Sequence, residues 1–72
     1  MRYIAVFPTL TLAQKAARVL KSENIASEVV KVDSTRTRRG CSWGIAFDEH
    51  KLFGVRMAFS NHSIAEREII KE

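Results

Sequence analysis

The 72-residue chain predicts an α+β fold, a β-α-β-β-α-β sandwich in which a four-stranded antiparallel sheet carries two helices on one face. Two observations lead to this prediction. Short apolar segments alternate with the period of two that is typical of strands, and longer segments between them repeat their apolar residues at helical spacing. No linker or low-complexity segment interrupts the pattern, so we expect a single small domain over residues 1–72.

The beginning of the chain predicts a strand and then a helix. Residues 2–7 alternate, with apolar side chains on both faces, and Pro8 ends the strand. A helix is expected over residues 11–22, because Thr11 and Gln14 have the spacing of a capping box. Its apolar residues fall on one side, so that side is expected to cover the sheet.

The middle of the chain predicts two more strands. Asn24 suits the left-handed conformation that closes a helix, and a strand is expected over residues 27–32. Another strand is expected over residues 43–47, after a connection that is longer than a simple hairpin needs. Gly44 and Ala46 share one face of this strand, where small side chains permit close approach by a helix or a ligand.

The end of the chain predicts a second helix and a fourth strand. Asp48 is expected to cap the helix, which ends at Asn61. Residues 64–71 are predicted as a strand, because a fourth strand completes a ferredoxin-like sheet with both helices on one face. The alternative is a charged helix over residues 64–72, since several residues there have high helix propensity.

Cys41 is the only cysteine, and Arg36, Arg38 and Arg39 lie within five residues before it. A nearby cation lowers the pKa of a thiol by favouring its charged form, and the thiolate is the form that attacks electrophiles. The segment therefore has two interpretations. Cys41 is either a reactive thiol activated by arginines, or a small apolar residue at a strand start beside solvated charges.

Composition limits the class of protein. Apolar residues make up 46% of the chain and charged residues 28%, which is typical of a chain that folds. A single cysteine cannot form an intramolecular disulfide, and the first residues lack the long apolar core of a signal peptide. No apolar stretch approaches the roughly 20 residues that span a bilayer. We therefore expect a cytoplasmic protein with no membrane segment.

The net charge of +4 comes largely from the three arginines near Cys41. A basic segment attracts nucleic acid, an acidic protein or a small anion. Basic residues do not alternate here with aromatic residues that would stack bases, which argues against nucleic acid. His50 and His62 lack the spacing of a metal site, and no phosphate-binding or catalytic-triad motif is present. We expect no metal, no cofactor and no enzymatic turnover.

The order of these features resembles a family of small domains, the selenium/sulfur carrier-like proteins. The resemblance covers nearly the whole chain, and in that family a Cys-Gly pair leads from a loop into an apolar strand. Ser42 stands here at the glycine position. The matching segments are Phe7-Pro8-Thr9, Ala16-Ala17-Arg18-Val19-Leu20-Lys21, Ile25, Gly40-Cys41, the strand residues Trp43, Ile45 and Phe47, and the helix start Asp48-Glu49.

The resemblance implies that Cys41 carries sulfur or selenium as a persulfide or a selenylsulfide. A protein donor would load the thiol and a protein acceptor would unload it. Residues around the thiol would hold the terminal anion or donate hydrogen bonds to it, namely Arg36, Arg38, Arg39, Gly40 and Ser42.

The alternative function is a ferredoxin-like interaction or regulatory module that binds an anion or a partner protein through the basic loop, with Cys41 incidental. A homodimer is compatible with either function. Its seam would contain Phe53, Met57 and Phe59 if these residues are not part of the core.

Overall fold

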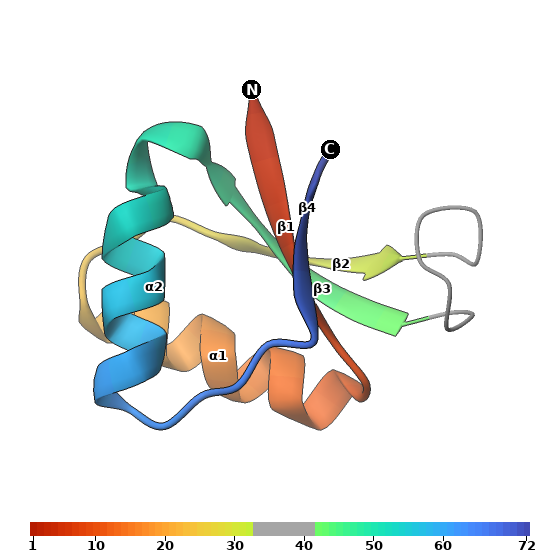
Figure 1. The fold of residues 1–72 in the computed structure, drawn as a ribbon. Helices are drawn as coiled ribbons and strands as arrows, with labels where there is room; N and C mark the ends of the chain where they lie inside the picture. The colour runs from red at the N-terminus through yellow and green to blue at the C-terminus, as the bar shows by residue number, and fades with distance from the viewer. Residues whose placement is uncertain (33–41) are drawn as a thin grey trace.

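The chain folds into the predicted α+β sandwich, with four strands in one antiparallel sheet and two helices on one face (Figure 1). The computed structural model describes residues 1–32 and 42–72. The strand order β2-β3-β1-β4 is that of a ferredoxin-like sheet. The elements are β1 (Arg2–Phe7), α1 (Leu10–Ser22), β2 (Glu28–Val32), β3 (Ser42–Asp48), the 3-10 helix η1 (Glu49–Lys51), α2 (Leu52–Asn61) and β4 (Glu68–Lys71).

The central strands β1 and β3 fix the register of the sheet. They pair from Arg2 opposite Asp48 to Phe7 opposite Trp43. β4 pairs with the other side of β1, and β2 pairs with the outer side of β3. Because side chains alternate along a strand, each central strand sends one set of apolar residues to the helices and another to the helix-free face.

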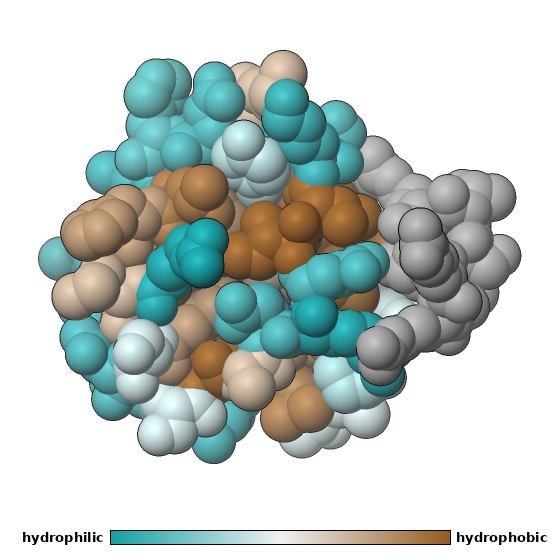
Figure 2. Space-filling view, in the orientation of Figure 1, coloured by the Kyte–Doolittle hydropathy of each residue, from teal (hydrophilic) through white to brown (hydrophobic). Residues whose placement is uncertain are grey.

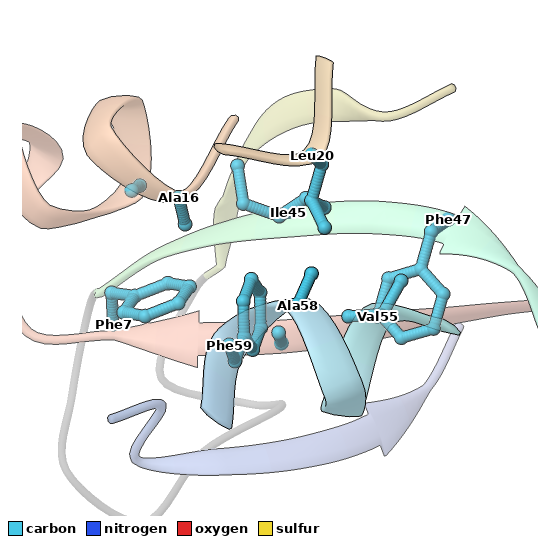
Figure 3. Packing of buried hydrophobic residues seen from close by; sticks show 10 residues of the cluster. Phe7, Ala16, Leu20, Ile45, Phe47, Val55, Ala58 and Phe59 are labelled. Atoms are coloured by element: carbon cyan, nitrogen blue, oxygen red, sulfur yellow. The ribbon is translucent and has the colours of Figure 1, made fainter. Parts of the chain in front are cut away.

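The main core lies between the sheet and the two helices (Figure 3). The rings of Phe7 and Phe59 meet edge to face, with their centroids 5.8 Å apart, and so join β1 to α2. α1 buries two alanines and one leucine, whose small total volume lets the helix lie close to β3. The buried residues of this cluster are Ala5, Phe7, Ala13, Ala16, Leu20, Ile45, Phe47, Val55, Ala58 and Phe59.

A second, smaller cluster lies on the helix-free face of the sheet. It contains Ile4, Val6, Val32 and Ala46, each with at most 1% of its surface exposed. The side chains of Ile4 and Val32 fill the space beside Gly44, because a Cβ at Gly44 would lie 2.5 Å from Ile4 Cγ2 and 3.0 Å from Val32 Cγ2. The close approach expected at the small residues of this strand is therefore made by neighbouring strands.

The start of α1 differs from the prediction. The helix begins at Leu10, and its N-cap is Thr9, whose Oγ1 accepts a hydrogen bond from the Leu12 N–H at 3.2 Å. Thr11 lies inside the first turn instead of capping it. The strand-to-helix connection needs only two residues, so the first hydroxyl after Pro8 takes the cap position. The expected left-handed residue after the helix is confirmed at Asn24, with φ 61°.

The C-terminal part contains the predicted strand but not over its predicted length. Ser63 has φ 57°, and the Ile64 N–H donates to the Phe59 carbonyl at 2.8 Å, which closes α2 and directs Ile64 onto the main core. The strand begins only at Glu68, just after the Arg67 N–H bonds to the Val6 carbonyl at 2.7 Å. Pairing with β1 replaces the helical alternative, because β1 otherwise leaves one edge unpaired.

No helix in the two described ranges is long and apolar enough to cross a membrane.

Candidate functional site

Most of the predicted carrier site lies in the connection between β2 and β3. Gly40, Cys41 and the three arginines, Arg36, Arg38 and Arg39, fall outside the described residues, which resume at position 42. Ser42 is the one predicted site residue that the structure describes. The contacts of Ser42 are therefore described here.

Ser42 belongs to the sheet, where it begins β3 one residue earlier than the sequence predicted. It stands opposite Val32 of β2, and the next residue, Trp43, stands opposite Phe7 of β1. Only 2% of Ser42 is exposed, and its Oγ has no hydrogen-bond partner among the described residues. A buried hydroxyl without a partner is costly, and such groups are rare in folded proteins.

The face that Ser42 shares with its neighbours explains its burial. Ser42, Gly44 and Ala46 alternate along β3 on the helix-free side, beside Val32 and the small second cluster. Pairing on both sides holds this end of β3 in place. Cys41 is bonded to Ser42, so one peptide unit joins the thiol-bearing residue to a fixed point of the sheet.

A second group of charges lies at the opposite end of the sheet, around Arg2. The guanidinium donates to Glu72 through Nε and Nη2, both at 2.7 Å, and to Glu28 Oε2 at 3.1 Å. Hydrogen bonds to Glu72, then to Glu28, raise the pKa of Arg2 above its usual value. Since the guanidinium is already held by two carboxylates of the chain, this group connects strands and leaves no cation free for a ligand.

The two histidines have separate local partners. His50 lies two residues after Asp48. The Asp48 carboxylate accepts a hydrogen bond from the His50 backbone N–H, and its Oδ1 lies 2.8 Å from the His50 ring Nδ1. The backbone hydrogen bond contributes most, and the contact with the ring contributes next, to lowering the pKa of Asp48 below its usual value. The ring Nε2 of His62 lies 3.3 Å from Glu23 Oε2. Within residues 1–32 and 42–72, no three potential metal ligands are grouped.

Asp48 caps a short 3-10 turn, and α2 follows that turn directly. The sequence prediction of a cap at Asp48 is therefore correct in position, although the capped element is η1. Asn61 ends α2 as expected.

No protein-family model, curated protein or solved structure matches the chain. The resemblance to selenium/sulfur carrier-like domains stays a prediction from the sequence.

Proposed function

We propose that this protein carries sulfur or selenium on Cys41 between a protein donor and a protein acceptor. The observation that supports the proposal is the position of Ser42, which pairs with Val32 of β2 at the start of β3, directly before Trp43, which pairs with Phe7 of β1. A transferred atom must be presented repeatably to two different partners, and sites joined to rigid elements are more precise than sites far from them. Cys41 is bonded to Ser42, the first described residue of β3.

The chemistry is thiol exchange and needs no external oxidant. The Cys41 thiolate attacks the terminal sulfur of a donor persulfide, a new sulfur–sulfur bond forms, and the donor cysteine leaves as a thiolate. An acceptor thiolate then attacks the terminal sulfur and releases the Cys41 thiolate. With selenium, a sulfur–selenium bond takes the place of the first new bond. A cysteine desulfurase is the class of donor that supplies sulfur in this form.

The surrounding residue types favour this chemistry. Arg36, Arg38 and Arg39 supply positive charge that stabilises both the thiolate and the terminal anion of a persulfide. Ser42 brings a hydroxyl that has no partner among the described residues. The reducing cytoplasm is the compartment in which a lone thiol of this kind stays available.

Sulfur transfer from a cysteine desulfurase tests the proposal. The intact protein, incubated with the desulfurase and radiolabelled cysteine, is expected to acquire label that a thiol reductant removes. Cys41→Ser abolishes the labelling, and its melting temperature stays near that of the original chain if residue 41 makes little packing contact.

A relocated thiol is the matched control. Ser60 is exposed on α2, so Cys41→Ser combined with Ser60→Cys keeps one accessible thiol in a different place. Equal labelling of this double variant contradicts a dedicated carrier site at Cys41. Absence of label on the intact protein with sulfur and selenium donors alike favours the interaction module, which binds through the basic loop.

A further inference from the structure

The two outer strands of the sheet differ in how well their free edges are protected. β2 and β4 are the outer strands in the order β2-β3-β1-β4. β4 has only four residues, and just before it the Arg67 N–H bonds to the carbonyl of Val6, the residue that stands opposite Glu68. Two residues thus oppose one, as in a β-bulge, and short or bulged strands resist further pairing. β2 pairs regularly over all five of its residues.

The hydrogen bonds of the sheet show which groups of β2 point outward. The Glu49 N–H donates to the Met1 carbonyl, so the odd-numbered residues of β1 bond to the odd-numbered residues of β3. The even-numbered residues of β3 therefore bond to the even-numbered residues of β2. The backbone N–H and C=O groups of Val29 and Lys31 point away from the sheet. Among the described residues these groups have no partner.

The side chains of Val29 and Lys31 lie on the helix side of this edge. They stand opposite Ile45 and Trp43, which pack in the main core. Val29 is 37% exposed, and Lys31 is exposed as well. The free edge therefore presents one apolar and one cationic side chain on the same face, two residues apart.

The helix side of the β2 edge is positively charged. Lys31 makes no ion pair within the described residues. Glu28 bonds to Arg2, and it lies on the helix-free face, three residues along the strand from Lys31. Asp33 lies outside the described residues. α1, which packs on the helix side and contacts β2, has no acidic residue and has three exposed cations, Lys15, Arg18 and Lys21.

The apolar surface of α2 is another exposed feature of the molecule, but it specifies no occupant. Figure 2 shows hydrophobic colouring over the region of α2, at the left of the molecule, where Phe53 is 76% exposed. Apolar contact has no preferred direction and does not select a charge. The edge of β2 is different, because its unpaired backbone groups require another strand and Lys31 selects negative charge.

We propose that the free edge of β2 binds an extended segment of a partner protein, which adds to the sheet as an antiparallel strand. Val29 and Lys31 each offer one N–H and one C=O, so two residues of the segment, two positions apart, exchange hydrogen bonds with them. The residue opposite Lys31 is acidic, and the second residue after it, opposite Val29, is apolar. This inference does not rest on the carrier function, because binding involves no step at Cys41.

A second copy of the chain fits this edge less well. Within β2, one antiparallel register pairs both outward residues, and it places Val29 opposite Lys31 of the other copy. The two Lys31 side chains then lie diagonally across the contact on one face, about 7–8 Å apart. Each copy also has a net charge of +4. Repulsion therefore opposes a pair of β2 edges, whereas an acidic segment is attracted to the same edge.

Nuclear magnetic resonance of the full chain with a synthetic peptide tests the contact. In the capped peptide Ser-Val-Glu-Val-Val-Thr-Ser, the glutamate stands opposite Lys31 and the second valine after it stands opposite Val29. We expect a dissociation constant of roughly 0.1–1 mM and slower amide exchange at Val29 and Lys31. Exchange at Ile69 and Lys71, the outward amides of β4, is expected to stay unchanged. No slowing at Val29 and Lys31 with about 5 mM peptide overturns the proposal.

Methylated peptides test the register. A methyl group on the amide nitrogen of the glutamate, or of the valine opposite Val29, removes a donor that points at β2. Either change is expected to weaken binding by about fivefold or more. The amide nitrogen of the valine between them points away from β2, so its methylation is expected to leave the affinity nearly unchanged. Equal weakening by all three changes overturns the proposal.

Charge reversal tests the part played by Lys31. Lys31→Glu is expected to weaken binding of the glutamate peptide by about threefold or more, and to bind better the peptide in which lysine replaces the glutamate. Lys71→Glu, on β4, makes the same change in net charge and is expected to keep the original preference. An unchanged preference in Lys31→Glu overturns the proposal. So does protection of Val29 and Lys31 that rises with protein concentration without peptide, since a second copy would then occupy the edge.

Discussion

At the scale of single residues, Gly44 shows how one missing side chain permits the helix-free face to close. Ile4 and Val32 approach from the two neighbouring strands into the volume that a Cβ would occupy. The alternation in the sequence indicated that Gly44 lies on a face of small residues. It did not indicate which neighbouring side chains fill the space beside Gly44. That depends on the register of three strands, which no local pattern specifies.

Two glycine substitutions test this packing. Gly44→Ala is expected to lower the free energy of unfolding by about 1–3 kcal/mol, because the new Cβ overlaps Ile4 Cγ2 and lies 3.2 Å from the Ala5 carbonyl oxygen. Gly54→Ala is the matched control, since its Cβ meets only Ile25 Cδ1 at 3.5 Å and helix propensity predicts a gain of up to about 1 kcal/mol. Urea denaturation of both variants measures the difference. Similar effects in both would show that Gly44 is not tightly enclosed.

The thiol and the arginines give the second prediction at this scale. Replacing Arg36, Arg38 and Arg39 by glutamine is expected to slow alkylation of Cys41 near neutral pH, because loss of the cations raises the thiol pKa and shrinks the thiolate fraction. The rate of iodoacetamide reaction as a function of pH measures it. Equal rates for the variant and the original chain would show that the arginines do not tune this thiol.

At the scale of elements, the start of α1 shows where local sequence signals compete. Thr9 and Thr11 both offer a hydroxyl, and only Thr11 has a glutamine three residues later. The structure uses Thr9 because the backbone there is extended, with φ −136° and ψ 156°, directly after the strand. The position at which β1 ends therefore determines which threonine caps α1. Predicting the cap requires the end of the strand as well as the start of the helix.

Alanine at each threonine tests the assignment of the cap. Thr9→Ala is expected to reduce the free energy of unfolding by about 1 kcal/mol, since the Leu12 N–H loses its acceptor. Thr11→Ala is expected to have little effect or to stabilise slightly, because Thr11 is exposed inside the first turn and alanine has the higher helix propensity. Thermal denaturation followed by circular dichroism measures both. A larger loss at Thr11 would contradict the cap at Thr9.

At the scale of the whole molecule, the order of elements was predictable but the long-range ion pairs were not. The alternating segments and the two helices predicted the ferredoxin-like sheet. The last strand, for which the sequence left a helix as the alternative, follows from the need to pair the free edge of β1. Arg2 bonds to Glu28, which is 26 positions away in the sequence, and to Glu72, which is 70 positions away. No rule of sequence spacing predicts these contacts. Of the candidate site, only Ser42 can be compared with its prediction, and its burial follows from the strand beginning one residue early.

The last prediction concerns how Arg2 holds the two edges of the sheet. Its guanidinium donates two hydrogen bonds to Glu72, just beyond β4, and one longer bond to Glu28 on β2. Lysine keeps the charge but cannot form the two-pronged bond, so Arg2→Lys is expected to speed amide hydrogen exchange in β4 while exchange in β3 changes little. These side chains are partly exposed, so high salt is expected to produce a similar loosening in the original chain.

Glu28→Gln separates the two halves of this contact. It weakens only the bond toward β2 and leaves the two-pronged bond to Glu72 intact, so β4 amides are expected to exchange as slowly as in the original chain. Nuclear magnetic resonance measures exchange at the amide of Ile70, which pairs with Ile4 of β1. β4 is only four residues long, so the protection of its amides from exchange depends strongly on contacts at its end. Glu72, which bonds to Arg2, is the residue just after β4. Unchanged exchange in Arg2→Lys would mean that strand pairing alone holds β4 in place.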